Sequence, residues 1–201
     1  ELGVLSMTFN MNIIDSVSRY IGPFRTVGEN TVIFSIEDFL NRQYYSGGAS
    51  RVIKRKIVEQ FGYLNQDCQT EDSVFNFRAF LTTGLGYCSI PMVNYRVHDN
   101  NISSPTNLLV GFDPKLIYKQ YKKDLDIAQK NGIINKCKYD LILRHLVHHR
   151  DKEEAIRKIY IKKMLVSRLA IYFPMIFSNK YSLRTKLSFL KTILSWKINK
   201  F

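Results

Sequence analysis

The sequence has no closely spaced cysteines, no apolar run long enough to cross a bilayer, and few acidic residues near its C-terminus. Cys68, Cys88 and Cys137 are odd in number, stand far apart and form no CxxC pair. This excludes a disulfide framework and favours reduced, buried thiols of a cytosolic protein. A membrane helix needs about 20 consecutive apolar residues, so we expect no transmembrane segment.

Positive charge is what the chain has in excess, and most of it lies in the tail. The 201 residues carry a net charge of +13, and from Lys152 onward there are twelve Lys or Arg against two Glu. Ten of the thirteen net charges therefore belong to the last quarter of the chain. Such a tail prefers a polyanion, either nucleic acid or an anionic membrane surface. The hydrophobic content of 45% is ordinary for a chain with a buried core.

The order of predicted elements divides the chain into a mixed α/β part, residues 1–107, and an all-helical part, residues 108–201. Ser35 is a plausible N-cap for a short helix with two acids in its first turn. Thr70 is a plausible cap and Gly84 a plausible end for a second helix. The predicted strands are residues 3–9, 31–34, 52–53 and 87–97. One predicted helix begins at residue 36, and the others cover residues 56–61, 70–83, 114–131, 136–149, 152–173 and 183–196.

Three short motifs occur in order between residues 46 and 103. They are Gly47-Gly48-Ala49-Ser50, then Thr70-Glu71-Asp72, then a segment from Tyr95 to Ser103 that reads YRVHDNNIS. Each is weak alone, but together and at these spacings they resemble the second half of family 2 glycosyltransferases, which are inverting enzymes with the GT-A fold. The resemblance covers about residues 44–104 and includes Arg78, which completes the family's "ED…R" pattern. It implies an α/β fold class: the C-terminal part of a GT-A fold, followed by an α-helical extension.

The resemblance implies that Asp72 is the catalytic base and that Glu71 helps to orient the acceptor. An inverting transfer needs a base that removes the proton of the acceptor hydroxyl during attack on the sugar carbon. A carboxylate at a helix start faces the positive end of the helix dipole. The alternative is that both residues are ordinary helix N-terminal acids.

The remaining site residues follow from the same resemblance. Gly47, Gly48 and Ala49 would let the backbone approach the substrate, and Arg96 would lie near the donor phosphates. His98 would join a diphosphate-bound divalent metal, Mg or Mn, that neutralises the leaving group. The alternative for His98 is a surface histidine in a polar loop, and residues 99–101 are expected to shape that turn.

The family's N-terminal half supplies a nucleotide-binding βαβ unit and an Asp-x-Asp motif. Neither is found before residue 44, where the chain is too short to hold them. We therefore expect this chain to be a fragment with the acceptor side and the base, inactive by itself.

Three other groups of polar residues are interpreted as structural. Asp124-Leu125-Asp126 has the Asp-x-Asp form but sits in a lysine-rich helical pattern, which indicates a solvated helix face with paired charges. Glu37-Asp38 lacks the downstream motifs. His145, His148 and His149 lack an HExxH pattern and a third ligand nearby, so a helix surface is favoured over a metal site.

The expected function is therefore transfer of a sugar from a nucleotide-sugar donor to a hydroxyl of a glycan or lipid-linked acceptor, as in cell-surface polysaccharide synthesis. Residues 160–201 alternate apolar faces with Lys and Arg, which is typical either of a peripheral anchor on an anionic membrane or of packing on the domain. We expect a cytoplasmic protein, peripheral on the inner face of the cell membrane. The competing interpretation is a non-enzymatic helical module that binds an anionic membrane or nucleic acid, although no recognised nucleic-acid module is present.

Overall fold

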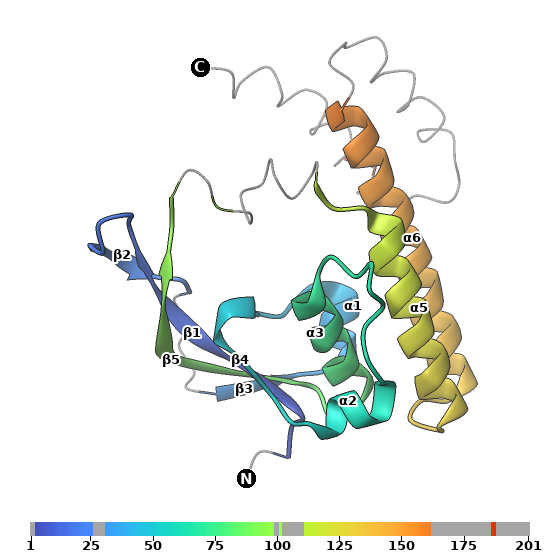
Figure 1. Cartoon of the computed structure of the whole chain (residues 1–201). Helices are drawn as coiled ribbons and strands as arrows, with labels where there is room; N and C mark the ends of the chain where they lie inside the picture. The colour runs from blue at the N-terminus through green and yellow to red at the C-terminus, as the bar shows by residue number, and fades with distance from the viewer. Residues whose placement is uncertain (1–2, 26–30, 99–100, 102–110, 162–185, 188–201) are drawn as a thin grey trace.

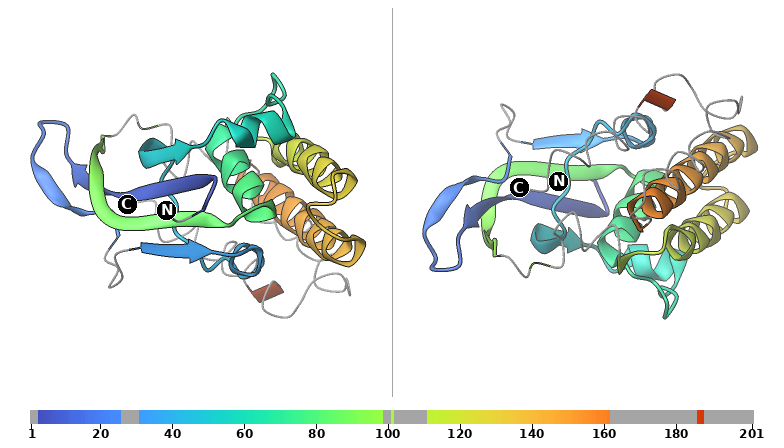
Figure 2. Two further views of the ribbon diagram at one scale, coloured as in Figure 1. Left: turned by 90° about the horizontal axis from the view of Figure 1, so that it is seen from below. Right: turned by 90° about the horizontal axis from the view of Figure 1, so that it is seen from above.

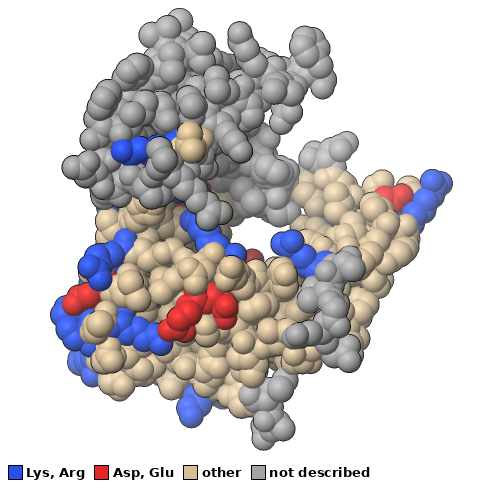
Figure 3. Space-filling view, turned by 180° about the vertical axis from the view of Figure 1, so that it is seen from behind, with Lys and Arg blue, Asp and Glu red and all other residues tan. Residues whose placement is uncertain are grey.

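The computed structural model describes residues 3–25, 31–98, 101, 111–161 and 186–187. Within them the chain is a mixed α/β protein in which a curled sheet lies on one side and a pair of long helices on the other, with three shorter helices between them (Figure 1). Two further views show the same arrangement (Figure 2), and a space-filling view from behind shows both basic and acidic side chains on the described surface (Figure 3). None of the helices described there combines the length and the apolar character needed to span a membrane.

The sheet is built around two parallel strands, β1 (Ser6–Ile14) and β5 (Leu85–Arg96). β2 (Tyr20–Pro23) and β4 (Arg51–Ile53) pair antiparallel with opposite ends of β1, and β3 (Thr31–Phe34) pairs antiparallel with β5. The strand order is β2-β1-β5-β3, with β4 beside β1. β3 reaches only residues 85–88 of β5, so Pro91 lies where β5 has an open side, as a residue without an amide donor requires.

The short helices follow the expected start and stop signals. In α1 (Ile36–Asn41), Ser35 and Asp38 form a reciprocal capping box. α2 (Lys56–Phe61) ends at Gly62, which has a positive φ of 73°. α3 (Glu71–Leu81) has Thr70 at its N-cap position as predicted, although the Thr70 side chain makes no capping hydrogen bond.

The two long helices are α5 (Pro114–Lys130) and α6 (Lys136–Ile161). α6 is continuous through residues 149–152, so the predicted division into two helices is wrong. The charged run at that point supports the helix, because Arg150 pairs with Asp151 at 2.7 Å and with Glu154 at 3.9 Å. The predicted helix 183–196 and the break at Pro174 lie outside the described residues, apart from 186–187.

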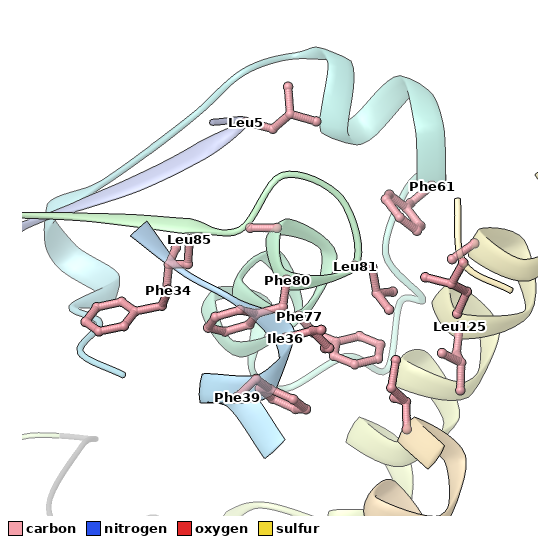
Figure 4. Close-up of a cluster of buried hydrophobic side chains, with 14 of the residues drawn as sticks. Leu5, Phe34, Ile36, Phe39, Phe61, Phe77, Phe80, Leu81, Leu85 and Leu125 are labelled. Atoms are coloured by element: carbon pink, nitrogen blue, oxygen red, sulfur yellow. The ribbon is translucent and has the colours of Figure 1, made fainter. Parts of the chain in front are cut away.

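One hydrophobic core joins the mixed and the helical segments. Phe77 and Phe80 of α3 pack beside Phe39 of α1, and Leu125 of α5 belongs to the same cluster (Figure 4). The cysteines behave differently from one another: Cys88 is buried, Cys68 is half-buried and Cys137 is exposed, all unpaired. The prediction of buried thiols is therefore wrong for Cys137.

Candidate active site

The acidic pair occupies the first turn of α3, where it meets the positive end of the helix. Glu71 is exposed and Asp72 is half-buried. The backbone N–H of Ser73 donates to Oδ1 of Asp72 at 2.8 Å. This bond fixes one carboxylate oxygen against the helix and leaves Oδ2 directed toward the small-residue loop.

That loop, residues 47–50, lies directly against Asp72. A Cβ built on Gly48 would collide with Oδ2 of Asp72, so only glycine permits this approach. A Cβ on Gly47 would come within 2.8 Å of Cε of Met11, so the loop is equally close to β1 on its other side. The structure thus brings together two motifs that stand more than twenty residues apart in the sequence.

Ser50 fastens the loop to the sheet. Its hydroxyl donates to the carbonyl of Phe9 at 2.5 Å and accepts from the Phe9 N–H at 3.3 Å. The short helical turn η1 (Gly48–Ser50) leads directly into β4. Ala49 is exposed on this turn, beside Gly48. The loop is therefore a rigid bridge between β1 and the start of α3.

A cation lies beside the acidic pair. Nη2 of Arg51 donates to Oδ1 of Asn76 at 2.8 Å, one turn along α3 from Asp72. Burial lowers the pKa of the Arg51 guanidinium, and the negative charges of Asp72 and Glu71 oppose that shift. Its Nε is buried without a hydrogen-bond partner among the described residues.

Two tyrosines close the site from other elements. Burial raises the pKa of Tyr44, which follows α1, and the nearby Asp72 charge adds to the rise. Burial also raises the pKa of Tyr121 on α5, and Tyr121 shares a hydrogen bond with the Ser73 side chain. Both phenols are therefore neutral hydrogen-bonding groups near the Asp72 carboxylate at physiological pH.

Arg96 and His98 are placed at the far end of β5. The Arg96 guanidinium donates to the carbonyls of Asp15 and Ser16 at 2.9 and 3.0 Å and to the Ser18 hydroxyl at 2.9 Å, so it braces the turn between β1 and β2. None of these bonds involves the acidic pair.

His98 is exposed, and its backbone N–H donates to Oδ1 of Asn101. Asn101 also donates to the Arg96 carbonyl, which confirms its role in shaping this turn, whereas Asp99 and Asn100 lie outside the described residues. Across the part of the chain that the structure describes, no three His, Cys, Asp or Glu side chains gather as a metal site. The described donors thus do not make a ligand set around His98.

Asp124 is not on a solvated helix face, so that expectation is wrong. Asp124 and Arg78 are both fully buried and joined by a bidentate ion pair, with Nε–Oδ2 at 2.7 Å and Nη2–Oδ1 at 3.1 Å. Gln120 donates to the same carboxylate at 2.9 Å. Asp126 does form the expected surface pair, with Lys122 at 2.6 Å. Arg78 therefore ties the helix that carries the acidic pair to α5.

The histidines of α6 are half-buried rather than fully on the surface. His145 packs beside the Phe39 ring at 5.7 Å between centroids and lies 6.4 Å from the His149 ring. Burial lowers the pKa of His145 and of His149 to about 4 each. Both are therefore neutral at physiological pH.

Sequence reasoning did not identify Arg51, Tyr44 or Tyr121 as site residues. Arg51 follows the small-residue loop directly, and a cation at that position is a signal that the sequence offers. Tyr121 stands far along the chain, and only the packing of α5 against α3 brings it to the site. Comparisons of the chain with protein-family models, with curated proteins and with solved structures found no match.

Proposed function

We propose that this chain is the acceptor-side part of an inverting glycosyltransferase and that Asp72 is its catalytic base. The observation that carries the proposal is the close approach of Gly48 to the Asp72 carboxylate. The loop must have glycine beside the carboxylate at the helix start, and glycine costs conformational entropy on folding, so this requirement is costly if the loop serves only as a turn. The absence of a side chain on Gly48 lets a substrate approach the Asp72 carboxylate along the loop backbone.

The chemistry assigned to Asp72 is a single proton transfer. Its carboxylate takes the proton of the acceptor hydroxyl as the oxygen forms a bond to the anomeric carbon. The bond from that carbon to the nucleoside diphosphate breaks, and its electron pair leaves with the phosphate. Glu71, exposed beside the base, would position the acceptor.

The GT-A assignment belongs to the same proposal. A mixed α/β fold with a parallel β1–β5 pair and a base at the start of the intervening helix supports it. The donor would be a nucleotide-sugar, bound with a divalent metal outside the described residues, and the acceptor would be a glycan or a lipid-linked glycan. Action on a lipid-linked acceptor would place the protein at the cytoplasmic face of a membrane.

The test is Asp72→Asn in the full-length protein, with release of nucleoside diphosphate measured in the presence of a glycan acceptor. Loss of a general base typically lowers turnover 10²–10⁴-fold, while donor binding is expected to persist. Asp126→Asn, which changes a surface ion pair on α5, is the matched control. Wild-type turnover by Asp72→Asn would remove Asp72 from the mechanism.

The second candidate is a non-enzymatic membrane-binding module, which the basic tail favours. Of that tail, residues 162–185 and 188–201 lie outside the described residues. Sedimentation with liposomes that contain or lack anionic lipid tests it, and only charge-dependent binding supports a peripheral membrane role. Charge-dependent membrane binding would be compatible with the enzyme assignment. Transfer activity that does not depend on lipid would instead mean that the tail packs on the domain.

A further inference from the structure

A cavity of about 330 Å³ lies where the helical segment meets the start of α3. This is within the range of about 300–1,000 Å³ that is typical of small-molecule sites. Thr70 and Ser73, which flank the acidic pair in the sequence, form one wall. The other walls come from α1, α5, α6 and Tyr44, which follows α1, and they include Phe39, Tyr118, Tyr121, Arg150 and Glu153.

The walls combine aromatic faces with a few polar groups. Tyr118 lies under the Arg150 guanidinium, with 4.5 Å from Cζ to the ring centroid. Arg150 uses Nε and Nη2 for Asp151, which leaves further N–H donors on a group that has five. Oγ1 of Thr70 is buried and has no hydrogen-bond partner within the described part of the chain. An unpaired buried hydroxyl is costly unless a ligand satisfies it.

This combination matches a sugar ring better than a lipid chain or a phosphate. The C–H face of a sugar packs on the electron-rich face of an aromatic ring, and its hydroxyls satisfy a guanidinium, a carboxylate and a hydroxyl together. A prenyl chain would leave the Thr70 hydroxyl and the Arg150 N–H groups that do not bond Asp151 desolvated without a ligand partner. A phosphate would meet the carboxylate of Glu153 in the same cavity.

The cavity is connected to Asp72 through its own wall. Ser73 donates its N–H to the Asp72 carboxylate, and its side chain shares a hydrogen bond with Tyr121. Tyr44 also lines the cavity and is close enough to Asp72 for the carboxylate to raise its pKa, after the larger effect of burial. A ligand in the cavity thus lies next to the residues that surround the base.

We propose that the cavity between α1, α3, α5 and α6 binds a sugar unit of the acceptor, so that the helical segment selects the acceptor. This inference rests on the proposed function. It assigns to α5 and α6 a role in recognition, next to Tyr44, Thr70 and Ser73 of the motif region.

The test is saturation-transfer NMR of the chain with methyl glycosides of a hexose, a 6-deoxyhexose and an N-acetylhexosamine. At least one glycoside is expected to bind, and Thr70→Val is expected to weaken it about fivefold, the effect of one lost neutral hydrogen bond. Because the Thr70 hydroxyl has no partner among the described residues, the same substitution is expected to raise the melting temperature. Thr82→Val is the matched control: its hydroxyl bonds the Arg78 and Ala79 carbonyls, so it should lose stability and keep sugar affinity.

A second pair of variants tests the polar end of the cavity. Arg150→Gln is expected to weaken binding about tenfold, since hydrogen bonds to charged groups are the stronger ones. Arg144→Gln changes the same charge at an exposed position of α6 and is expected to have no effect. Absence of saturation transfer from every glycoside, or wild-type affinity in both Thr70→Val and Arg150→Gln, would overturn the proposal.

The two proposals fail in different ways. If Asp72→Asn abolishes transfer while the cavity variants leave sugar affinity unchanged, the acceptor site lies elsewhere and the enzyme assignment stands. If sugars bind in the cavity but Asp72→Asn transfers at the wild-type rate, the cavity assignment stands and the base assignment fails.

Discussion

Replacing Arg78 by methionine is expected to destabilise the fold by about 3–5 kcal/mol, the usual cost of removing one partner of a buried ion pair. The guanidinium donates to Asp124 at 2.7 and 3.1 Å and to the Gly62 carbonyl at 2.9 Å. Both charged side chains have no exposed surface. Arg78→Met would leave the Asp124 carboxylate with Gln120 as its recorded donor, so most of the cost is the burial of an uncompensated charge.

The assay is urea and thermal unfolding followed by circular dichroism, with a double-mutant cycle. For a chain of this size a loss of 3–5 kcal/mol lowers the melting temperature by about 6–20 °C. The double variant Arg78→Met/Asp124→Leu should lose about 2 kcal/mol less than the sum of the single variants, because no charge is then left unpaired. Lys122→Met removes the partly exposed pair with Asp126 and should cost less than about 1 kcal/mol.

Two results would refute this reasoning. One is an Arg78→Met variant that loses no more stability than Lys122→Met. The other is strict additivity of the Arg78 and Asp124 substitutions, which would mean that the two residues do not stabilise each other. Either outcome would also mean that the ion pair is not what positions α3 against α5.

Three further predictions concern the loop, its anchor and a half-buried histidine. Gly48→Ala is expected to displace the Asp72 carboxylate and to lower transfer at least tenfold in the full-length protein, since a Cβ there collides with Oδ2. Ser50→Ala removes two bonds to the Phe9 backbone and is expected to cost about 1–2 kcal/mol in chemical unfolding. Burial holds the pKa of His145 at about 4, against about 6.5 in the unfolded chain. Stability that is present above pH 6.5 is therefore lost as the pH falls toward 4, by about 1 kcal/mol at pH 5 after screening. His145→Gln should flatten that dependence in pH-dependent urea titrations.

The controls use positions where the same change meets no neighbour. Gly22→Ala adds a Cβ with no atom within 4 Å and should leave transfer unchanged; an equal loss in Gly22→Ala and Gly48→Ala would disprove the steric argument. Ser16→Ala is the comparison for Ser50→Ala, at an exposed serine in the β1–β2 turn. An unchanged pH dependence in His145→Gln would show that other groups cause it.

Elements with local signals were predictable from the sequence. The Ser35 N-cap predicted the start of α1, Gly62 predicted the end of α2, and Thr31–Phe34 forms the expected strand. Strand β2 was missed because its turn is set by a side chain: Oδ1 of Asp15 accepts the N–H groups of Val17 and Arg19. A sequence pattern of alternating hydrophobicity does not report such a turn.

The site was predictable only where its residues are near one another in sequence. Glu71 and Asp72 lie at a helix start as expected, whereas their contact with Gly48 depends on how Ser50 anchors the loop to β1. Asp124 was misinterpreted for the same reason. Its lysine-rich neighbours indicate a surface, but its burial is decided by Arg78, a residue on another helix.

The Arg78–Asp124 pair also bears on the order in which the chain becomes structured during synthesis. Asp124 leaves the ribosome 46 residues after Arg78, an interval of roughly 2–9 seconds at about 5–20 residues per second. During that interval Arg78 lacks its carboxylate, and the Phe77 ring lacks its contact with Tyr121 at 4.6 Å. The helix that presents Asp72 therefore reaches its final burial only after α5 has been made.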